Sequence, residues 1–301
     1  MKKKDLILLV LSLALAVFGA VQVIGHFSTQ QAGKEAEEEL RKIWHAEDAT
    51  EIPTLGPSET AVPELTEAPP VKAAEEITAV PAEPAEQAEA KVTRLKRRMY
   101  PDNPGRTVSD RFKALRKENR DIVGWLSIGK MQDAAVTQRD NEYYMDHDVS
   151  GRQNVSGAVF LDEGVSLQMR PYTLILYGHN MRDESRFGWL RKYENEDFFR
   201  KNRYIRFDTL YEEGQYVVFS EGTVSTEEGD ANYLDFFGLN SLRTDERTQA
   251  ISVLQDVSVL DCDVDVRIDD QILVLVTCVE KDTDRRIVAA RRIRDGEEYE
   301  W

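Results

Sequence analysis

Two predicted strands end at residues whose side chains could do chemistry together. "TLILYG" (173–178) is followed at once by His179, and "QILVLVTC" (271–278) ends in Cys278. A cysteine thiolate is a strong nucleophile, and a histidine can accept and return a proton near neutral pH. The pair therefore predicts nucleophilic catalysis by a thiol, with the histidine as its acid and base.

Two arginines follow the cysteine at short range. The acidic stretch "VEKDTD" (279–284) separates Cys278 from Arg285 and Arg286, which open the strand pattern "RRIVAARRI" (285–293). An arginine that returns on the next strand can lie beside the thiol, lower its pKa or hold a developing oxyanion. The alternative is that these arginines form a solvated strand end and that the histidine is only a polar residue at a sheet edge.

The two cysteines, Cys262 and Cys278, leave a second interpretation open. Cysteines of an exported chain often form a disulfide, and a turn near Asp269 and Asp270 would place these two opposite each other in a hairpin. A permanent disulfide is incompatible with a nucleophilic Cys278, although a redox-gated one is not. The sequence has no HExxH or CxxC spacing and no glycine-rich phosphate loop, so we expect no metal and no other cofactor.

The N-terminus predicts a membrane anchor. Three lysines precede the uncharged segment 6–24, which at 19 residues is long enough to cross the roughly 30 Å hydrocarbon core as a helix. The lysines predict that residues 1–5 stay in the cytoplasm and that everything after the span lies outside the cell. A cleavable signal peptide is the alternative, because Ala14-Leu15-Ala16 resembles a cleavage site.

Residues 25–99 are predicted to form an extracellular juxtamembrane segment and a linker. "QQAGKEAEEELRKIWHAED" (30–48) could form a short helix. Residues 46–99 contain no aromatic residue and seven of the ten prolines, so they cannot bury enough apolar surface to fold and should form a disordered, extended spacer. The formal net charge of -16 argues against binding nucleic acid, which requires a basic face.

Residues 100–301 are predicted to form the folded domain. An amphipathic stretch that includes Phe112, Leu115 and Ile122 opens it, with Ser109 as a possible helix cap. Strand patterns then dominate, with helical patterns at 185–202 and 245–258 between them. We therefore expect a mostly β, α+β fold: a closed barrel with peripheral helices.

An ordered series of motifs resembles the class B sortases, the membrane-anchored cysteine transpeptidases of Gram-positive cell surfaces. The series runs over nearly the whole domain, from about Arg111 to Ile293. It comprises "FKALRKENRDIVGWLSI", "TQRDNEYYMDHD", "GAVFLDEG", "LILYGHNM", "FGWLRKYENEDFFRKN", a helical insertion around 235–255, "ILVLVTC" and "DRRIVAARRI".

The resemblance implies a sortase-like barrel and specific roles. Cys278 would be the nucleophile and His179 the general acid and base. Arg286 would hold the oxyanion or the substrate carbonyl, because it directly precedes an apolar pair as the family's arginine does. We expect Val276, Thr277 and Asn180 to contact substrate. Val276 stands where the family commonly has serine, and the loss of that hydroxyl removes one hydrogen bond to substrate.

The activity implied is acyl transfer. The enzyme would cleave a C-terminal sorting motif of exported proteins through a thioester and pass them to an amine of a cell-wall precursor or a pilin. The alternative is a sortase-like surface module that binds peptides or scaffolds proteins with its Cys, His and Arg unused. A cell-wall transpeptidase of the L,D type is disfavoured, because its S-x-G-C-x-R pattern is missing around "LVTCVE".

Overall fold

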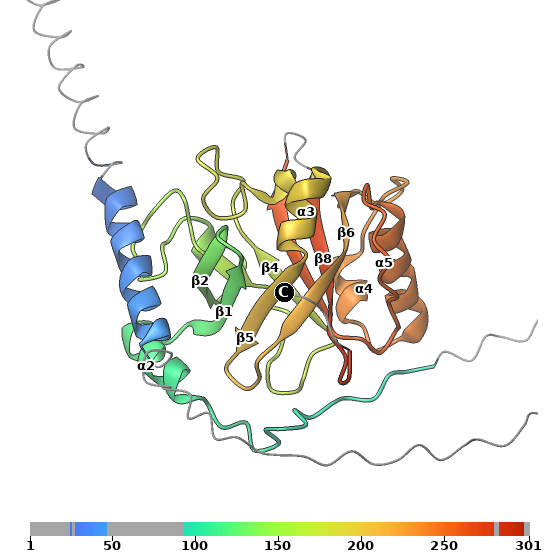
Figure 1. The fold of residues 1–301 in the computed structure, drawn as a ribbon, viewed down its shortest axis with the longest axis horizontal. Coiled ribbons are helices and arrows are strands. Elements are labelled where there is room, and N and C mark those ends of the chain that lie inside the picture. Colours follow the sequence, from blue (N-terminus) through green and yellow to red (C-terminus); the bar gives the residue numbers. More distant parts are fainter. Residues whose placement is uncertain (1–24, 26–27, 47–92, 280–282, 298–301) are drawn as a thin grey trace, which may run out of the picture.

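Eight strands close into a barrel in the order β1-β2-β3-β4-β7-β8-β6-β5 (Figure 1). The computed structural model describes residues 25, 28–46, 93–279 and 283–297. The strands are β1 (Ile122–Ile128), β2 (Gln132–Thr137), β3 (Val159–Leu161), β4 (Thr173–Tyr177), β5 (Tyr204–Thr209), β6 (Gln215–Ser225), β7 (Ile272–Cys278) and β8 (Asp284–Arg292). The closed barrel confirms the predicted fold class.

In the barrel, β7 lies between β4 and β8; it pairs in parallel with β4 and antiparallel with β8. Its residues alternate between two apolar environments: Leu273 and Leu275 join the main core, whereas Val274 and Val276 join a second cluster under the helices α4 (Phe236–Asn240) and α5 (Thr244–Asp256). Burial on both faces explains why this strand reads as a continuous apolar run. These helices occupy the predicted insertion.

The first helix of the domain, α2 (Asp110–Glu118), is shorter than the amphipathic pattern suggests. Ser109 caps it by accepting a hydrogen bond from the backbone N–H of Phe112, as predicted. The helix ends at Glu118, because Asn119 turns to an extended conformation and its N–H closes the last turn on the carbonyl of Leu115. Ile122 therefore begins β1 and does not extend the helix.

The helical pattern predicted over 185–202 is divided into two short elements. A 3₁₀ helix, η2 (Leu190–Glu194), is followed by α3 (Glu196–Asn202). Asn195 separates them: its backbone is extended, and its side chain accepts the backbone N–H of Phe198. An asparagine in this role begins a new helix, which is why the pattern does not form one continuous helix.

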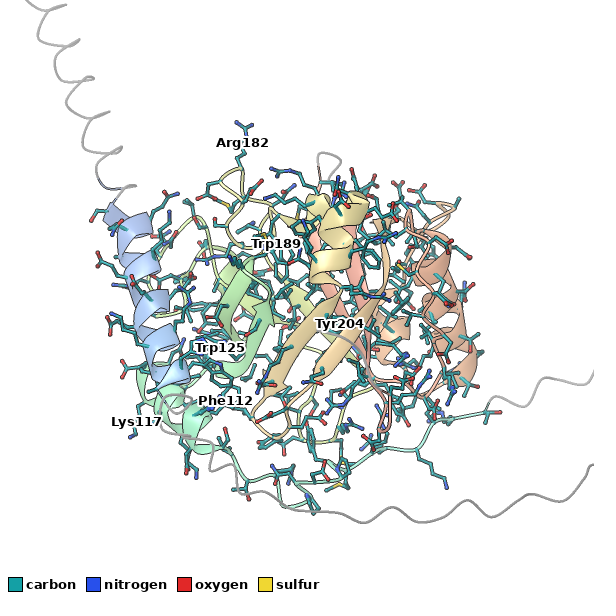
Figure 2. All side chains as sticks on the ribbon, viewed as in Figure 1. Phe112, Lys117, Trp125, Arg182, Trp189 and Tyr204 are labelled. Carbon is teal, nitrogen blue, oxygen red and sulfur yellow. The ribbon has the colours of Figure 1, made fainter. Side chains whose placement is uncertain are left out.

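A helix over residues 28–45, which overlaps the predicted 30–48, lies against the barrel (Figure 1). Trp44 stacks on Trp125 of β1 at a centroid distance of 4.9 Å and meets Phe112 edge-on. Figure 2 labels Trp125 and Phe112, which lie on the side of the barrel that this helix covers. Residues 94 and 98 also form single β-bridges to the folded domain. The domain thus includes segments from both ends of the region predicted as juxtamembrane segment and linker.

Within the described residues, no helix is both long and apolar enough to cross a bilayer. The predicted span at 6–24 and most of the predicted linker lie outside the described residues.

Candidate active site

His179 and Cys278 line one cavity of about 190 Å³ at one end of the barrel. The parallel pairing of β4 and β7 brings them there: Tyr177 pairs with Val276, and the backbone N–H of Gly178 donates to the carbonyl of Val276 at 3.2 Å. Neighbouring parallel strands end at the same edge of a sheet. The next residues along each strand therefore emerge side by side.

The His179 ring is held by the segment before β3. Its Nε2 lies 2.6 Å from the carbonyl oxygen of Met145, the last residue of the 3₁₀ helix η1 (Tyr143–Met145). A carbonyl oxygen can only accept a hydrogen bond, so Nε2 carries a proton in this arrangement. The contact fixes the orientation of the imidazole at the rim of the cavity.

Two hydrogen bonds join the ends of β4 and β7. The hydroxyl of Thr277 donates to the carbonyl of Gly178 at 2.6 Å, and the side-chain amide of Asn180 donates to the carbonyl of Cys278 at 2.9 Å. Cys278 itself is exposed. The residues on both sides of His179 are therefore tied to the strand end that carries the thiol.

The three predicted substrate residues have different positions. Val276 and Thr277 line the cavity, but Val276 is fully buried in its floor and the Thr277 hydroxyl is already bonded within the protein. Asn180 reaches the backbone of Cys278 through its side-chain amide. This geometry gives Thr277 and Asn180 a role in holding the two strand ends together.

The two arginines lie on opposite faces of β8. Cys278 pairs with Arg285 and Thr277 pairs with Arg286. Directly opposed residues of an antiparallel pair point to the same face of the sheet, and successive residues alternate. Arg285 accordingly lines the cavity with Cys278 and His179. Arg286, to which the family resemblance gave the oxyanion, is not among the residues that line this cavity.

The guanidinium of Arg286 is engaged by two acidic side chains. Its Nη1 lies 2.6 Å from Oε1 of Glu221 on β6 and 2.6 Å from Oε1 of Glu194 in η2. Glu221 is fully buried; burial raises the pKa of its carboxyl, and the Arg286 charge opposes that rise. Arg286 therefore balances a buried carboxylate that would otherwise be isolated.

A polar group at the cavity wall was not predicted from the sequence. Tyr177 is hydrogen-bonded to Asp162, which also accepts from the side-chain amide of Asn141 at 3.0 Å. Burial and Asp162 raise the pKa of Tyr177, whereas nearby Arg285 lowers it. Asn141 and Met145 lie in one of the family-like motifs, but their neighbourhood with β4 depends on how the chain folds back.

Both cysteines are free thiols. Cys262 is half-buried and packs against the main core, and residues 258–268 form no strand, so the disulfide-bearing hairpin is absent from the described chain. Burial raises the pKa of Cys262 to about 11. In the described part of the chain, no group of three or more His, Cys, Asp or Glu side chains is placed to hold a metal ion.

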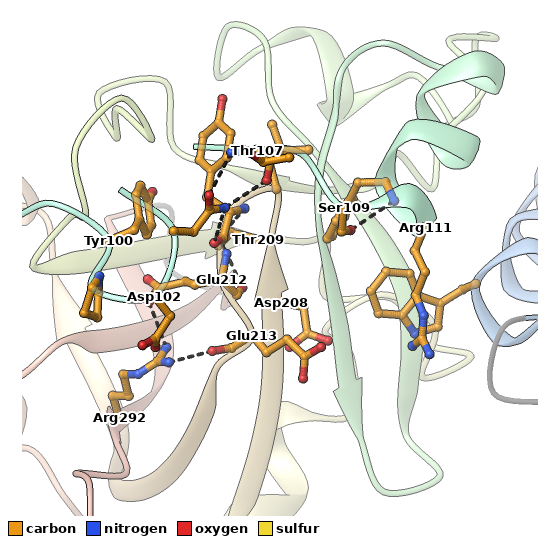
Figure 3. Close-up of a pocket in the computed structure, with 16 residues that line it drawn as sticks. Tyr100, Asp102, Thr107, Ser109, Arg111, Asp208, Thr209, Glu212, Glu213 and Arg292 are labelled. Carbon is orange, nitrogen blue, oxygen red and sulfur yellow. Dashed lines mark hydrogen bonds and ion pairs between the residues drawn. The ribbon is translucent and has the colours of Figure 1, made fainter. Parts of the chain in front are cut away.

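A larger cavity of about 620 Å³ lies at the opposite end of β8, where Arg292 and several acidic side chains line it (Figure 3). Asp208, Glu212 and Glu213 face it, together with Tyr100 and Asp102 (Figure 3). Its lining contains neither cysteine nor histidine. The thiol chemistry is therefore confined to the smaller cavity.

Known proteins similar to this chain are sortases. It is 31% identical to sortase B of Staphylococcus aureus over 195 residues, 62% of this chain and 75% of the relative, and 32% identical to sortase B of Listeria monocytogenes over 187 residues, 59% of this chain and 71% of the relative. No family model matches the sequence.

Solved structures with a similar fold point to the same family as the sequence relatives. A Bacillus anthracis protein described as similar to sortase B aligns with a TM-score of 0.55 and 30% identity, covering 67% of this chain and 89% of that one. A sortase B–substrate complex from S. aureus aligns with a TM-score of 0.56 and 28% identity, covering 63% and 88%. With the fold, the ordered motifs and these relatives in agreement, the chain belongs to the class B sortases and is a sortase-type transpeptidase.

Proposed function

We propose that this transpeptidase cleaves a C-terminal sorting motif of exported proteins and transfers them to an amine through a thioester on Cys278. The observation that carries the proposal is the cavity at the ends of β4 and β7. A thiol, an imidazole and a guanidinium line it together, from Cys278, His179 and Arg285. These are the three groups that acyl transfer by a cysteine requires.

The reaction has two halves. The Cys278 thiolate attacks the carbonyl carbon of the threonine in the sorting motif, and the carbonyl oxygen becomes an oxyanion. When the intermediate collapses, the C–N bond breaks and protonated His179 gives its proton to the leaving amine. The incoming amine then attacks the thioester, His179 takes its proton, and the C–S bond breaks to restore the thiolate.

Arg285 is the side chain that we assign to the oxyanion. It shares its face of the β7–β8 pair with the thiol and lines the same cavity. A guanidinium at this position stabilises negative charge that develops only in the transition state, so it accelerates the chemical step. Arg286, committed to Glu221 and Glu194, lies on the other face.

The cavity suits a peptide with an apolar contact next to the scissile bond. Phe160, Val276 and Met145 contribute its apolar walls, and Tyr177 and Asn141 add polar groups. Such a mixture is typical of sites that orient a ligand with few polar contacts. The S. aureus sortase B that aligns with this chain has been seen in complex with a substrate, which supports peptide binding at the corresponding groove.

We also propose that residues 6–24 hold the enzyme in the cell membrane as a single span, with the domain outside the cell. Helix 28–45 supports this arrangement, because it begins at the end of the barrel that carries α3 (Figure 1). Near its start, Lys34 lies 4.0 Å from Asp183 in the loop after His179. An anchor joined there would keep the active site close to the membrane, where lipid-linked cell-wall precursors carry amines.

Mass spectrometry of the full-length protein in detergent tests the proposal. The enzyme is incubated with a sorting-motif peptide library and with cell-wall-type and lysine amines as acceptors. We expect cleaved peptide, an acyl adduct on Cys278 and an amine-linked product. Cys278→Ala should abolish all three, and Cys262→Ser should retain them as the matched control. If no peptide acylates the protein, the transpeptidase is not acting on sorting motifs, and the peptide-binding module becomes the better account.

A further inference from the structure

Helix 28–45 contacts both chain segments that hold His179. Glu37 pairs with Arg186 in the loop after the histidine, and the carbonyls of Thr29 and Ala32 accept side-chain hydrogen bonds from Asn154 and Arg152 in the segment before β3. We infer that Glu37, acting through Arg186, is a positioning residue for His179. The inference rests on the proposed role of His179 as proton donor and acceptor.

Arg186 is the centre of this arrangement. Its side chain is only 7% exposed, its Nη1 pairs with Glu37, and its Nε donates to the carbonyls of Ser156 and Gly157 at 3.1 and 2.9 Å. Its backbone forms an isolated bridge to Asn180. One guanidinium thus joins the N-terminal helix, the segment before β3 and the loop that follows the catalytic histidine.

The backbone of the loop after His179 is strained at Arg186, so contacts of the Arg186 side chain are needed to stabilise it. Arg186 has a positive φ of 55°, a conformation that costs free energy for a side chain other than glycine. The next residue, Phe187, donates its backbone N–H to the carbonyl of His179 at 3.0 Å. A change in the position of Arg186 would therefore be passed directly to the backbone of the histidine.

The segment before β3 carries the other half of the arrangement. The backbone N–H of Ala158 donates to the carbonyl of Tyr144 at 2.9 Å, next to the Met145 carbonyl that holds the His179 ring. Arg186 binds the carbonyls of the two preceding residues in the same segment. Arg186 therefore supports both the backbone of His179 and the partner of its imidazole.

Glu37 supplies the negative charge that compensates the buried guanidinium of Arg186. It is the one carboxylate paired with Arg186 among the described residues, since the other bonds of the guanidinium go to carbonyl oxygens. Removing one member of a buried ion pair leaves the other charge uncompensated, and the surrounding chain rearranges to solvate it. The rearrangement would occur at the two segments that hold His179.

The test compares Glu37→Gln, Glu37→Asp and Glu38→Gln in the full-length protein in detergent. Glu38 is the matched control, because it is exposed, lies on the same helix and loses the same charge. We expect Glu37→Gln to lower kcat about tenfold with KM within about twofold of the wild-type value, as for a defect in the proton-transfer step. Glu37→Asp should recover much of kcat, and Glu38→Gln should match the wild type.

Hydrogen exchange makes the inference testable without activity. In Glu37→Gln, the backbone amides of Phe187 and Ala158 should exchange faster, by about tenfold or more, than in the wild type and in Glu38→Gln. Unchanged exchange and unchanged kcat would overturn the positioning role. If the wild type transfers no peptide, the proposed function fails, whereas faster exchange in Glu37→Gln alone would still establish the structural link. If Glu38→Gln lowered kcat as much as Glu37→Gln, the positioning role of Glu37 would also be overturned.

Discussion

Cys278 lies directly opposite Arg285 in the β7–β8 ladder, so the thiol and this guanidinium share one face of the sheet. Arg286, the next residue, is turned by the strand to the other face, where it meets Glu221. Two adjacent arginines therefore have different tasks: one lines the catalytic cavity, and the other neutralises a buried carboxylate.

Arg285→Ala should lower kcat by about 10²- to 10³-fold, the loss seen when one oxyanion donor is removed, while the fold stays intact. Arg285→Lys should recover only part of the rate, because an ammonium lacks the planar fork of a guanidinium. Steady-state kinetics with a cleavable sorting peptide measures the effect, with circular dichroism as the control for folding. A wild-type kcat in Arg285→Ala would remove this residue from the mechanism.

Arg286→Ala should lower the free energy of unfolding. It leaves Glu221 buried without its cation, which costs about 3 kcal/mol of the free energy of unfolding. Without Arg286, burial and the nearby charge of Glu194 act on Glu221 unopposed, and its raised pKa rises further. A carboxyl whose pKa is raised by folding favours the folded state when protonated, and this contribution is lost as pH rises through the folded-state pKa.

The loss caused by Arg286→Ala should therefore be larger at pH 8 than at pH 5. Urea unfolding of the wild type and the variant at both pH values measures it. The double variant Arg286→Met with Glu221→Leu removes both charges and should recover most of the stability. If Arg286→Ala instead unfolds like the wild type and loses kcat, the assignments of the two arginines must be exchanged.

Gly157→Ala should disturb the carbonyl that holds His179. Gly157 has a φ of +56°, and a Cβ there would lie 2.5 Å from the carbonyl oxygen of Tyr144 and 2.7 Å from that of Met145. We expect a loss of about 2 kcal/mol or more in stability and a lower kcat. Gly229→Ala is the control, since its φ of +99° is also unfavourable for alanine but no atom lies within 4 Å.

Thermal unfolding and peptide turnover together check the Gly157 prediction. Backbone strain alone would destabilise Gly229→Ala at least as much as Gly157→Ala and would leave both variants equally active. Loss of turnover confined to Gly157→Ala would support the link from Gly157 to the Met145 carbonyl and the His179 ring.

The two thiols should react with iodoacetamide at different rates. Burial raises the pKa of Cys262 to about 11, so at pH 8 only about one thousandth of it is thiolate. Because Cys278 is exposed, we expect it to be modified first, and modification of Cys262 to rise steeply above about pH 10. Peptide mass spectrometry of the wild type and Cys278→Ala separates the sites. Equal rates at pH 8 would contradict the burial of Cys262.

The amino-acid sequence by itself determined which segments carry the chemistry. The apolar run of β7 and the β-branched run of β4 required buried strands, and the residues that ended them, Cys278 and His179, had to emerge at a barrel rim. Hydrophobic pattern is a local property, so it can be read along the chain. Ser109 as a helix cap could be read in the same way.

Only the tertiary structure decided which arginine faces the thiol. A shift of one residue in strand pairing moves every side chain to the other face, and pairing depends on the loop and on both neighbouring strands. The sequence next to Ile287 and Val288 favoured Arg286, whereas the ladder with β7 and β6 turned Arg285 to the cavity. The pairing of Glu37 with Arg186 was equally beyond the sequence, since it joins residues 149 positions apart. Local patterns place strand ends and caps, and long-range packing decides what those ends meet.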